Sequence, residues 1–262
     1  MPAGARVRGW AGDRLRLSRS MTWAAPGLLR VRQGMEVRHR ELGADATGPY
    51  WVFAIVKVRR GRIRYLHGRG LVVPPGPCFA LFMPPWSIVR TARTACDLTT
   101  DAVVSAAPVF EGAPPRPIAW RWRGGRAPLT AAEIAAAVRG AASAVEISRE
   151  VDAAGAARQA KALVDQAYSR PVTLGRLAAE SGVSASVMSR AFKQAFGMSA
   201  VEYRHRLRIM DALFRIASGG DILSVLDDVG FGDASRLYSH FRSLLCSPPG
   251  SHRTRTSKNA KT

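Results

Sequence analysis

The sequence lacks three features that would place it in well-defined classes. Its three cysteines, Cys78, Cys96 and Cys246, lie far apart and form no Cys-x-x-Cys pair, which argues against a disulfide framework and a structural zinc site. No apolar run approaches the roughly 18 residues of a transmembrane helix. The Arg-rich residues 1–20 also lack the apolar stretch of a secretory signal. We therefore expect a protein of the reducing cytoplasm that has no membrane partner.

Acidic residues are scarce as well. The chain of 262 residues has 19 acidic against 39 basic residues, a net charge of +20. Such a balance favours a polyanionic partner, nucleic acid first and an anionic membrane surface second, although a solvated basic surface stays open as an alternative. Residues 1–126 carry a net +14, residues 127–157 a net −2 and residues 158–262 a net +8. Because positive charge is spread along the chain, it does not locate a binding surface.

The first half reads as strands. Between residues 50 and 94, short β-branched and aromatic runs are cut by Pro-Pro-Gly-Pro (74–77) and Pro84-Pro85, which mark turns because proline cannot lie in a central strand. This pattern predicts an antiparallel sandwich or small barrel over residues 21–126, with a boundary loop at 109–117. Residues 1–20 are expected to be a flexible arm, or an upstream extension if translation begins at Met21.

An alanine-rich segment, residues 127–157, predicts a helical linker. Thr130 and Glu133 have the spacing of a capping box at a helix start. A 4-3-4-3 apolar spacing then follows, typical of a short coiled-coil seam, at Ile134, Val138, Ala141, Val145 and Ser148. Packing within the chain and a dimer seam both remain open. A second helix is expected from about Ala157 to Tyr168.

Residues 158–256 contain two predicted helix pairs, followed by a basic tail at 257–262. In the first pair Thr173 and Ser184 are suitable helix caps, and Ser181-Gly182-Val183 makes the turn between the helices. Met188, Phe192 and Ala195 form the inner face of the second helix. Its outer face, which suits a DNA major groove, carries Ser186, Ser189, Arg190, Lys193 and Gln194.

The second pair, from Asp221 to Leu244, repeats this plan around a turn at Gly230-Phe231. Leu237, Phe241 and Leu244 are expected to face inward. The outer face would carry Ser235, Arg236, Tyr238, Ser239 and Arg242. A long helix at about 199–218 joins the two pairs, so both outer helices could enter successive major grooves, roughly 34 Å apart.

At this point the chain resembles the AraC/XylS family of bacterial transcription regulators. "VTLGRLAAESGVSASVMSRAFKQAFGMSAVEYRHRLRI" (172–209) follows the first helix-turn-helix and connecting helix of that family, and Gly230-Phe231, Phe241 and the Pro-Pro before Arg253 follow the second. Three positions depart from the family, which usually has a small residue at Leu226, often glycine at Cys246 and an aromatic at His252. Ser235 and Ser239 also supply no Arg-like base reader. We therefore expect Arg190 in the first unit to be the stronger base reader and the second unit to act through phosphates or DNA shape.

The resemblance implies an N-terminal cupin-like antiparallel β-barrel that binds a small effector and supports a homodimer, with linker helices and an all-α double helix-turn-helix domain after it. An apolar effector pocket is expected among Trp51, Phe53, Tyr65, Phe79, Phe82 and Trp86, although ordinary barrel core is the more common role for any one of them. The region offers only His39 and His67 as imidazole ligands, so we expect neither a metal nor a cofactor.

Three functions follow from these features. The leading one is a sequence-specific regulator that binds promoter DNA, responds to a small effector, works with RNA polymerase at the bacterial nucleoid and acts as an activator. The alternative is a non-specific architectural DNA binder, which the widespread basic charge favours. An enzyme is the weakest candidate, because none of the five histidines lies in a Gly-x-Ser-x-Gly or His-Glu-x-x-His context.

Overall fold

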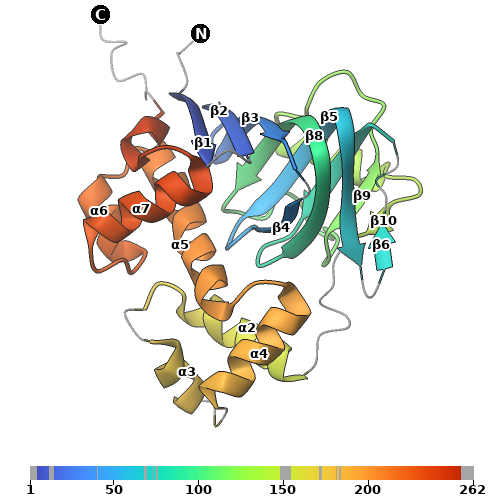
Figure 1. Ribbon diagram of the computed structural model, residues 1–262. Coiled ribbons are helices and arrows are strands. Elements are labelled where there is room, and N and C mark those ends of the chain that lie inside the picture. Colours follow the sequence, from blue (N-terminus) through green and yellow to red (C-terminus); the bar gives the residue numbers. More distant parts are fainter. Residues whose placement is uncertain are drawn as a thin grey trace, which may run out of the picture.

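The computed structural model describes residues 5–11, 15–39, 41–67, 70–72, 74, 76–147, 155–170, 173–180, 182 and 184–254. The chain folds into an N-terminal antiparallel sheet and a C-terminal helical part (Figure 1). The strands are β1 (Ala5–Ala11), β2 (Leu15–Ala25), β3 (Leu28–Val37), β4 (Glu41–Ala46), β5 (Trp51–His67), β6 (Gly70–Val72), β7 (Cys78–Met83), β8 (Ile88–Ser105), β9 (Ile118–Arg121) and β10 (Val145–Glu146).

The helices are α1 (Ala131–Arg139), α2 (Gly155–Ala167), α3 (Leu174–Glu180), α4 (Ala185–Phe196), α5 (Ala200–Ala217), α6 (Ile222–Asp228) and α7 (Ala234–Leu245), with a short 3-10 helix at Pro249–His252. Helix α5 runs along the sheet, with α6 and α7 on its other side and α2–α4 at its lower end in Figure 1. Among the described residues, no helix is long and apolar enough to cross a membrane.

The sheet has the order β1-β2-β3-β8-β5-β7-β9-β10, with β4 added to β8 and β6 added to β5. The long strands β5 and β8 pair along most of their length, with register shifts near Arg60 that bend them. Gly61 lies at this bend with a φ of +78°. Its hydrogen faces the backbone of Thr94–Cys96 so closely that a Cβ would overlap it. Glycine at this position therefore lets the backbones of β5 and β8 approach closely, where a side chain would hold them apart.

The two faces of the sheet serve different partners. One, called the outer face here, packs Phe53, Phe82, Val103 and Trp120 against Ile134 and Val138 of α1. The other, called the inner face, turns toward α5 and carries Leu29, Val52, Ala54, Leu81 and Val104. Side chains alternate along each strand, so the same strands supply both a packed core and a surface that meets the helical part.

Several predictions about the first half need correction. Residues 15–20, expected in an arm, belong to β2 and pair with β3 from Leu15↔Val37 onward. The loop at 109–117 is not a domain boundary, because β9 and β10 follow it in the same sheet. The expected linker at 127–157 begins with α1, which packs on the outer face. Only the second linker helix, α2, matches the prediction closely.

The 4-3-4-3 spacing does not form one continuous helical seam, and Ile134 and Val138 show the packing within the chain that was left open as one of its two interpretations. The predicted capping box is present, since Thr130 and Glu133 hydrogen-bond reciprocally at the start of α1, but this helix ends at Arg139. Ile134 and Val138 are used against the sheet, and Val145 lies in β10. Ser148 lies outside the described residues. This short alanine-rich helix buries its narrow apolar stripe on the nearest apolar surface, which here is the sheet.

Candidate DNA-reading surface and interdomain cavity

The first helix-turn-helix unit forms as its local signals predict. Thr173 accepts a hydrogen bond from the backbone of Arg176, and Ser184 accepts one from Val187, which caps α3 and α4. Gly182 has a φ of +67°, the left-handed geometry that glycine favours; its neighbours Ser181 and Val183 lie outside the described residues. Helix α4 buries Met188, Phe192 and Phe196. All five of its predicted DNA contacts are exposed: Ser186, Ser189, Arg190, Lys193 and Gln194.

The second unit has the same construction. Asp221 caps α6 through the amides of Leu223 and Ser224, and Asp233 caps α7 through that of Ser235. Helix α7 buries Leu237, Phe241 and Leu245, while Leu244 is only partly buried. Its predicted DNA contacts include one half-buried residue, Tyr238, and four exposed ones: Ser235, Arg236, Ser239 and Arg242.

A compact joint holds the two units together. Arg204 and Arg208 of α5 both donate to the carbonyl oxygens of Tyr168 and Arg170, just after α2. Gly230, with a φ of +78°, presses against the same turn, and a Cβ there would overlap the carbonyl oxygen of Ser169. Burial lowers the pKa of Arg208 to about 10, and Arg204 adds to this effect. The tight bend between α6 and α7 is therefore fixed by a neighbour outside its own unit.

The three departures from the family pattern are accommodated. Leu226 is buried in the core beneath α5 and α7. Cys246 ends α7 with a left-handed φ of +57°, the position that Gly197 holds at the end of α4. His252 is fully buried, lies 5.7 Å from the Phe241 ring and hydrogen-bonds the Ser247 hydroxyl at 2.7 Å. Burial lowers its pKa to about 3, with a further contribution from Arg19, so His252 behaves as a neutral aromatic ring.

The sheet is tied to α5 by a buried carboxylate. Asp211 accepts hydrogen bonds from the Tyr50 hydroxyl at 2.7 Å, the Tyr168 hydroxyl at 2.9 Å and Arg215 Nε at 2.9 Å. Tyr50 also stacks on Phe214 of α5, with ring centroids 4.5 Å apart. These contacts join the sheet, the end of α2 and α5 at one point. Burial, and then Asp211, raises the pKa of both tyrosines.

A cavity of about 1010 Å³ lies between the inner face and the helical part. Strands β2, β3, β4, β5, β7 and β8 contribute to one wall. The other wall comes from α5 and α7, through Ile209, Met210, Leu213, Phe214, His240, Ser243, Leu244 and Leu245. The cavity thus borders on both the helix that joins the two units and the helix that carries the second set of predicted DNA contacts.

The six predicted pocket aromatics are not brought together at this cavity. Only Tyr65 lines it. Phe53, Phe82 and Trp51 belong to the outer-face core, Phe79 lies within the inner-face core, and Trp86 packs on Tyr168. His39 lines the cavity, and the side chain of His67 lies outside the described residues. Within the described part of the chain, no group of three metal-ligating side chains is found.

The sequence interpretation missed Arg19, the most unusual residue of the cavity wall. Its Nε and one amino nitrogen donate to Oε1 of Gln33 at 3.0 and 2.5 Å, while the other amino nitrogen is buried without a hydrogen-bond partner. Among the described residues it pairs with no carboxylate, and burial lowers its pKa to about 10. Arg93, in contrast, is buried beside Asp45 and Glu41 at 2.9 and 3.9 Å. Alternation of apolar and polar residues in "LLRVRQGMEV" (28–37) was the signal that could have revealed this wall.

Helix α7 also packs on α5 through aromatic rings. His205 of α5 and His240 of α7 have ring centroids 4.1 Å apart, and Phe231 lies 5.6 Å from His240. Burial, followed by His240 and the nearby arginines, lowers the pKa of His205 to about 4. Neutral imidazoles can stack in this way without repulsion, so α7 rests directly on α5.

Two helix pairs with capped, exposed polar helices and a shared joint have the arrangement of a domain with two helix-turn-helix units. Residues 177–255 match the family model described as a helix-turn-helix domain. In this domain the chain is similar to AraC-like transcription regulators.

The chain is 35% identical over 85 residues to a putative AraC-like transcription regulator of Streptomyces lividans, a match covering 32% of this chain and 28% of that protein. It is 29% identical over 89 residues to the transcriptional regulatory protein HptR of Staphylococcus aureus, covering 34% and 35%. The chain thus spans about a third or less of the curated relatives it matches. A crystal structure of ToxT from Vibrio cholerae aligns over 87% of this chain and 97% of that one, with 11% identity and a TM-score of 0.45.

Proposed function

We propose that the protein is a sequence-specific transcription regulator that places α4 and α7 in successive major grooves of promoter DNA. The supporting observation is the pair of exposed polar faces on two capped helices, joined by a single helix, α5. Arg190 is the base reader on α4, because its guanidinium can fork to O6 and N7 of guanine. Ser186 and Lys193 flank it on the exposed side and would bind phosphates.

Enrichment of bound fragments from a random DNA pool tests this function. Two conserved blocks separated by about one helical turn are expected. Equal affinity for enriched and scrambled DNA would instead favour the architectural alternative. On the enriched site, Arg190→Ala should weaken binding by about 1–3 kcal/mol, 5- to 150-fold, and relax one base position. Arg62→Ala, which removes an exposed arginine from β5, is the matched control and should change affinity less than twofold.

We further propose that a small effector binds in the interdomain cavity and acts through α5 and α7. Its volume, about 1010 Å³, is that of a ligand site for a drug-sized molecule. Apolar side chains such as Val31, Met35, Leu81 and Leu213 dominate its wall. Arg19 contributes a buried cation that lacks a carboxylate, and an uncompensated buried charge is costly. An apolar molecule with one acidic group satisfies both features.

A pair of matched probes tests the effector class. Octanoate and octanol share an apolar chain but only octanoate is anionic, so octanoate should stabilise the full chain more in thermal unfolding. Arg19→Met keeps the apolar bulk and removes the charge, and it should abolish the difference between the two probes. Arg62→Met should leave the difference unchanged. Retention of the octanoate preference in Arg19→Met contradicts this effector class, while leaving the DNA-binding assay unaffected.

The resemblance to the AraC/XylS family supports two further parts of the proposal, activation through RNA polymerase and action as a homodimer. Run-off transcription from a promoter carrying the enriched site should rise when the protein is added. Sedimentation at assay concentrations should give twice the 28.3 kDa chain mass. A fall in transcript, or a monomer bound at the site, would contradict the respective part.

A further inference from the structure

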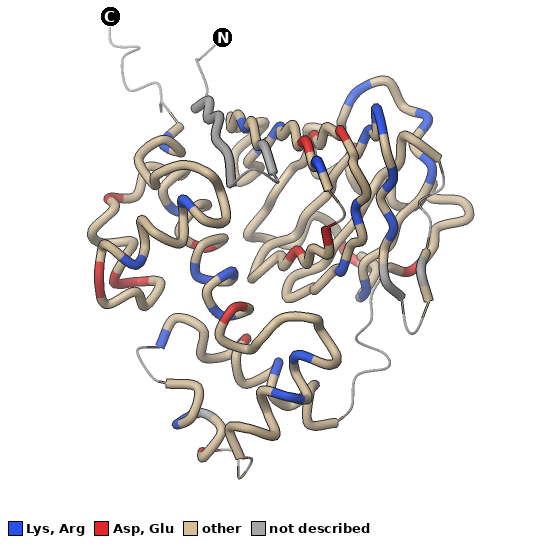
Figure 2. Tube along the Cα trace, viewed as in Figure 1, with Lys and Arg blue, Asp and Glu red and all other residues tan. Residues whose placement is uncertain are grey.

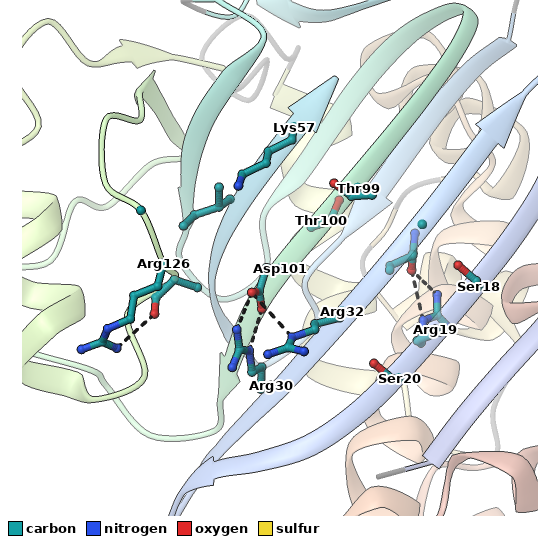
Figure 3. A pocket seen from close by; sticks show the side chains of 15 residues that line it. Ser18, Arg19, Ser20, Arg30, Arg32, Lys57, Thr99, Thr100, Asp101 and Arg126 are labelled. Atoms are coloured by element: carbon teal, nitrogen blue, oxygen red, sulfur yellow. Dashed lines mark hydrogen bonds and ion pairs between the residues drawn. The ribbon is translucent and has the colours of Figure 1, made fainter. Parts of the chain in front are cut away.

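The outer face of the sheet holds a second hollow, which shares only Arg19, Gln33 and Thr100 with the described lining of the interdomain cavity. It has a volume of about 610 Å³ and lies where α1 no longer covers the strands, beside the loop at 125–127 (Figure 3). This hollow is called the outer groove here. Along β5 the outward residues change from Phe53 and Ile55 to Lys57, and along β8 from Val103 to Asp101 and Thr99. The groove therefore begins where the outer face changes from apolar to polar.

Strand register fixes the floor of the outer groove in two rows. One row runs Ser20, Arg32, Asp101, Ile55 across β2, β3, β8 and β5, and the next runs Ser18, Gly34, Thr99, Lys57. Neighbouring strands lie about 4.8 Å apart, and successive outward residues about 6.8 Å apart. Gly34 leaves a gap between two hydroxyl-bearing residues, and a Cβ there would lie 2.7 Å from the Ser18 hydroxyl oxygen. This gap has hydroxyl donors on both sides.

Cations surround this floor in excess. Arg19, Arg30, Arg32, Lys57 and Arg126 line the groove, and Asp101 is the only acidic residue among the described residues that line it. Asp101 is already bound by Arg30 through two hydrogen bonds of 2.8 and 2.5 Å, with Arg32 Nε more distant at 3.8 Å. Arg126 pairs with Glu133 at the start of α1.

Arg32 and Lys57 therefore carry the surplus charge. The Arg32 side chain is 60% exposed, and Lys57 is exposed. Their Cα atoms are about 12 Å apart from the strand spacings, on opposite sides of Thr99, so both long side chains can reach a group above it. Arg19 and Gln33 also line the groove, but alternation along the strands turns their side chains toward the other face of the sheet, where they hydrogen-bond each other.

We propose that the outer groove binds the phosphate group of a small phosphorylated molecule. A phosphate spreads two negative charges over three oxygens, which a forked guanidinium, an ammonium and hydroxyl donors can bind together. A single carboxylate offers one charge and cannot engage Arg32 and Lys57 equally. The remaining volume of the groove accommodates the body of a small ligand. This site differs from the interdomain cavity in face, polarity and ligand class.

Titration calorimetry of the full chain with inorganic pyrophosphate at constant ionic strength tests the site. The double variant Arg32→Ala/Lys57→Ala should bind pyrophosphate at least tenfold more weakly. Arg60→Ala/Arg62→Ala removes the same charge from exposed positions of β5 outside the groove and should change affinity less than twofold. Equal losses in both double variants, or equal binding of acetate and pyrophosphate, would overturn the proposal.

Two further measurements test the assignment. The first distinguishes DNA phosphates from a small phosphorylated molecule, and the second removes a negative charge from the groove instead of positive charges. If the groove held DNA phosphates, Arg32→Ala/Lys57→Ala would lower the slope of log affinity for DNA against log salt by about 1.8, or 0.9 per contact; that result overturns the small-molecule proposal, and an unchanged slope supports it. Asp101→Asn releases Arg30 and Arg32 from their carboxylate and should tighten pyrophosphate binding several-fold. Weaker binding in that variant would contradict the assignment.

Discussion

Removing one hydroxyl at the buried carboxylate tests how the sheet is joined to the DNA-binding part. Asp211 is 3% exposed at its side chain and has three hydrogen-bond donors, of which Tyr50 is the only one from the sheet. Tyr50→Phe keeps the ring stacked on Phe214 and removes the 2.7 Å hydrogen bond. A hydrogen bond to a charged group contributes about 1.5–3 kcal/mol. We expect a loss of about 2 kcal/mol in the free energy of unfolding.

Urea unfolding followed by tryptophan fluorescence measures this loss, and thermal unfolding should show a midpoint about 4–8 °C lower for a chain of this size. Tyr238→Phe is the control, because its half-buried hydroxyl has no hydrogen-bond partner in the described part of the chain; its stability should change by less than about 0.5 kcal/mol. Tyr50→Phe with equally small effect would refute the view that Asp211 joins the two parts.

The double variant with Tyr168→Phe sharpens the result. Each single variant leaves Asp211 with two donors, whereas the double variant leaves it with Arg215 alone. A buried carboxylate that loses donors becomes progressively more costly to keep charged. The loss of stability in the double variant should therefore exceed the sum of the two single-variant losses by about 0.5 kcal/mol or more, because the two tyrosines share one hydrogen-bond network.

Three further perturbations address single backbone and titration features. Gly230→Ala should cost at least about 2 kcal/mol in urea unfolding because of its positive φ and the overlap with Ser169, whereas Gly232→Ala, with nothing within 4 Å of the added Cβ, should cost less than half of that. Cys246→Gly should gain about 1 kcal/mol by relieving a left-handed non-glycine residue; a loss would show that its side chain matters more than its backbone. Because the pKa of His252 is lowered to about 3, the unfolded chain binds a proton below pH 6.5 that the fold does not, so stability is lost as pH falls from 6.5 toward 3. At pH 5 the loss is about 2 kcal/mol, and His252→Phe should reduce the difference between urea unfolding at pH 7.5 and pH 5 by that amount.

The helical half could be predicted because its signals are local. Caps at Thr173 and Ser184, the left-handed glycines and the 3.6-residue spacing of Met188 and Phe192 all act within a few residues. The predicted DNA-contact residues fall on exposed helix faces for the same reason, although their contact with DNA remains a prediction. Two helices of the same pattern, about 48 residues apart, carried most of the information.

For the N-terminal half, the sequence predicted an antiparallel sheet but not which strands pair or in which register. Strand pairing joins distant residues, such as Leu28 with Ser105, and no local pattern gives that register. Arg16 and Arg19 made residues 15–20 resemble a charged arm, yet these residues belong to a strand that pairs with β3. The cavity wall was missed because its residues come from six strands and two helices, so the aromatic residues nearest in sequence were chosen instead.

Charge did not locate function by itself. Figure 2 shows lysine and arginine on the strands as well as on the helices. The informative charges are those that lack a partner. Arg19 has a buried nitrogen without a hydrogen-bond partner, and Arg32 and Lys57 belong to a group of cations that outnumber the one carboxylate beside them.

The position of helix α5 determines how binding of an effector in the cavity would change DNA recognition. The same eighteen residues form a wall of the cavity and set the separation of α4 and α7. A ligand that tilts α5 by a few degrees alters the phase between the two reading helices along the duplex. Promoters would then be sorted by the number of base pairs between their half-sites, so that one protein would select different genes with and without the ligand while its overall affinity for DNA stayed the same.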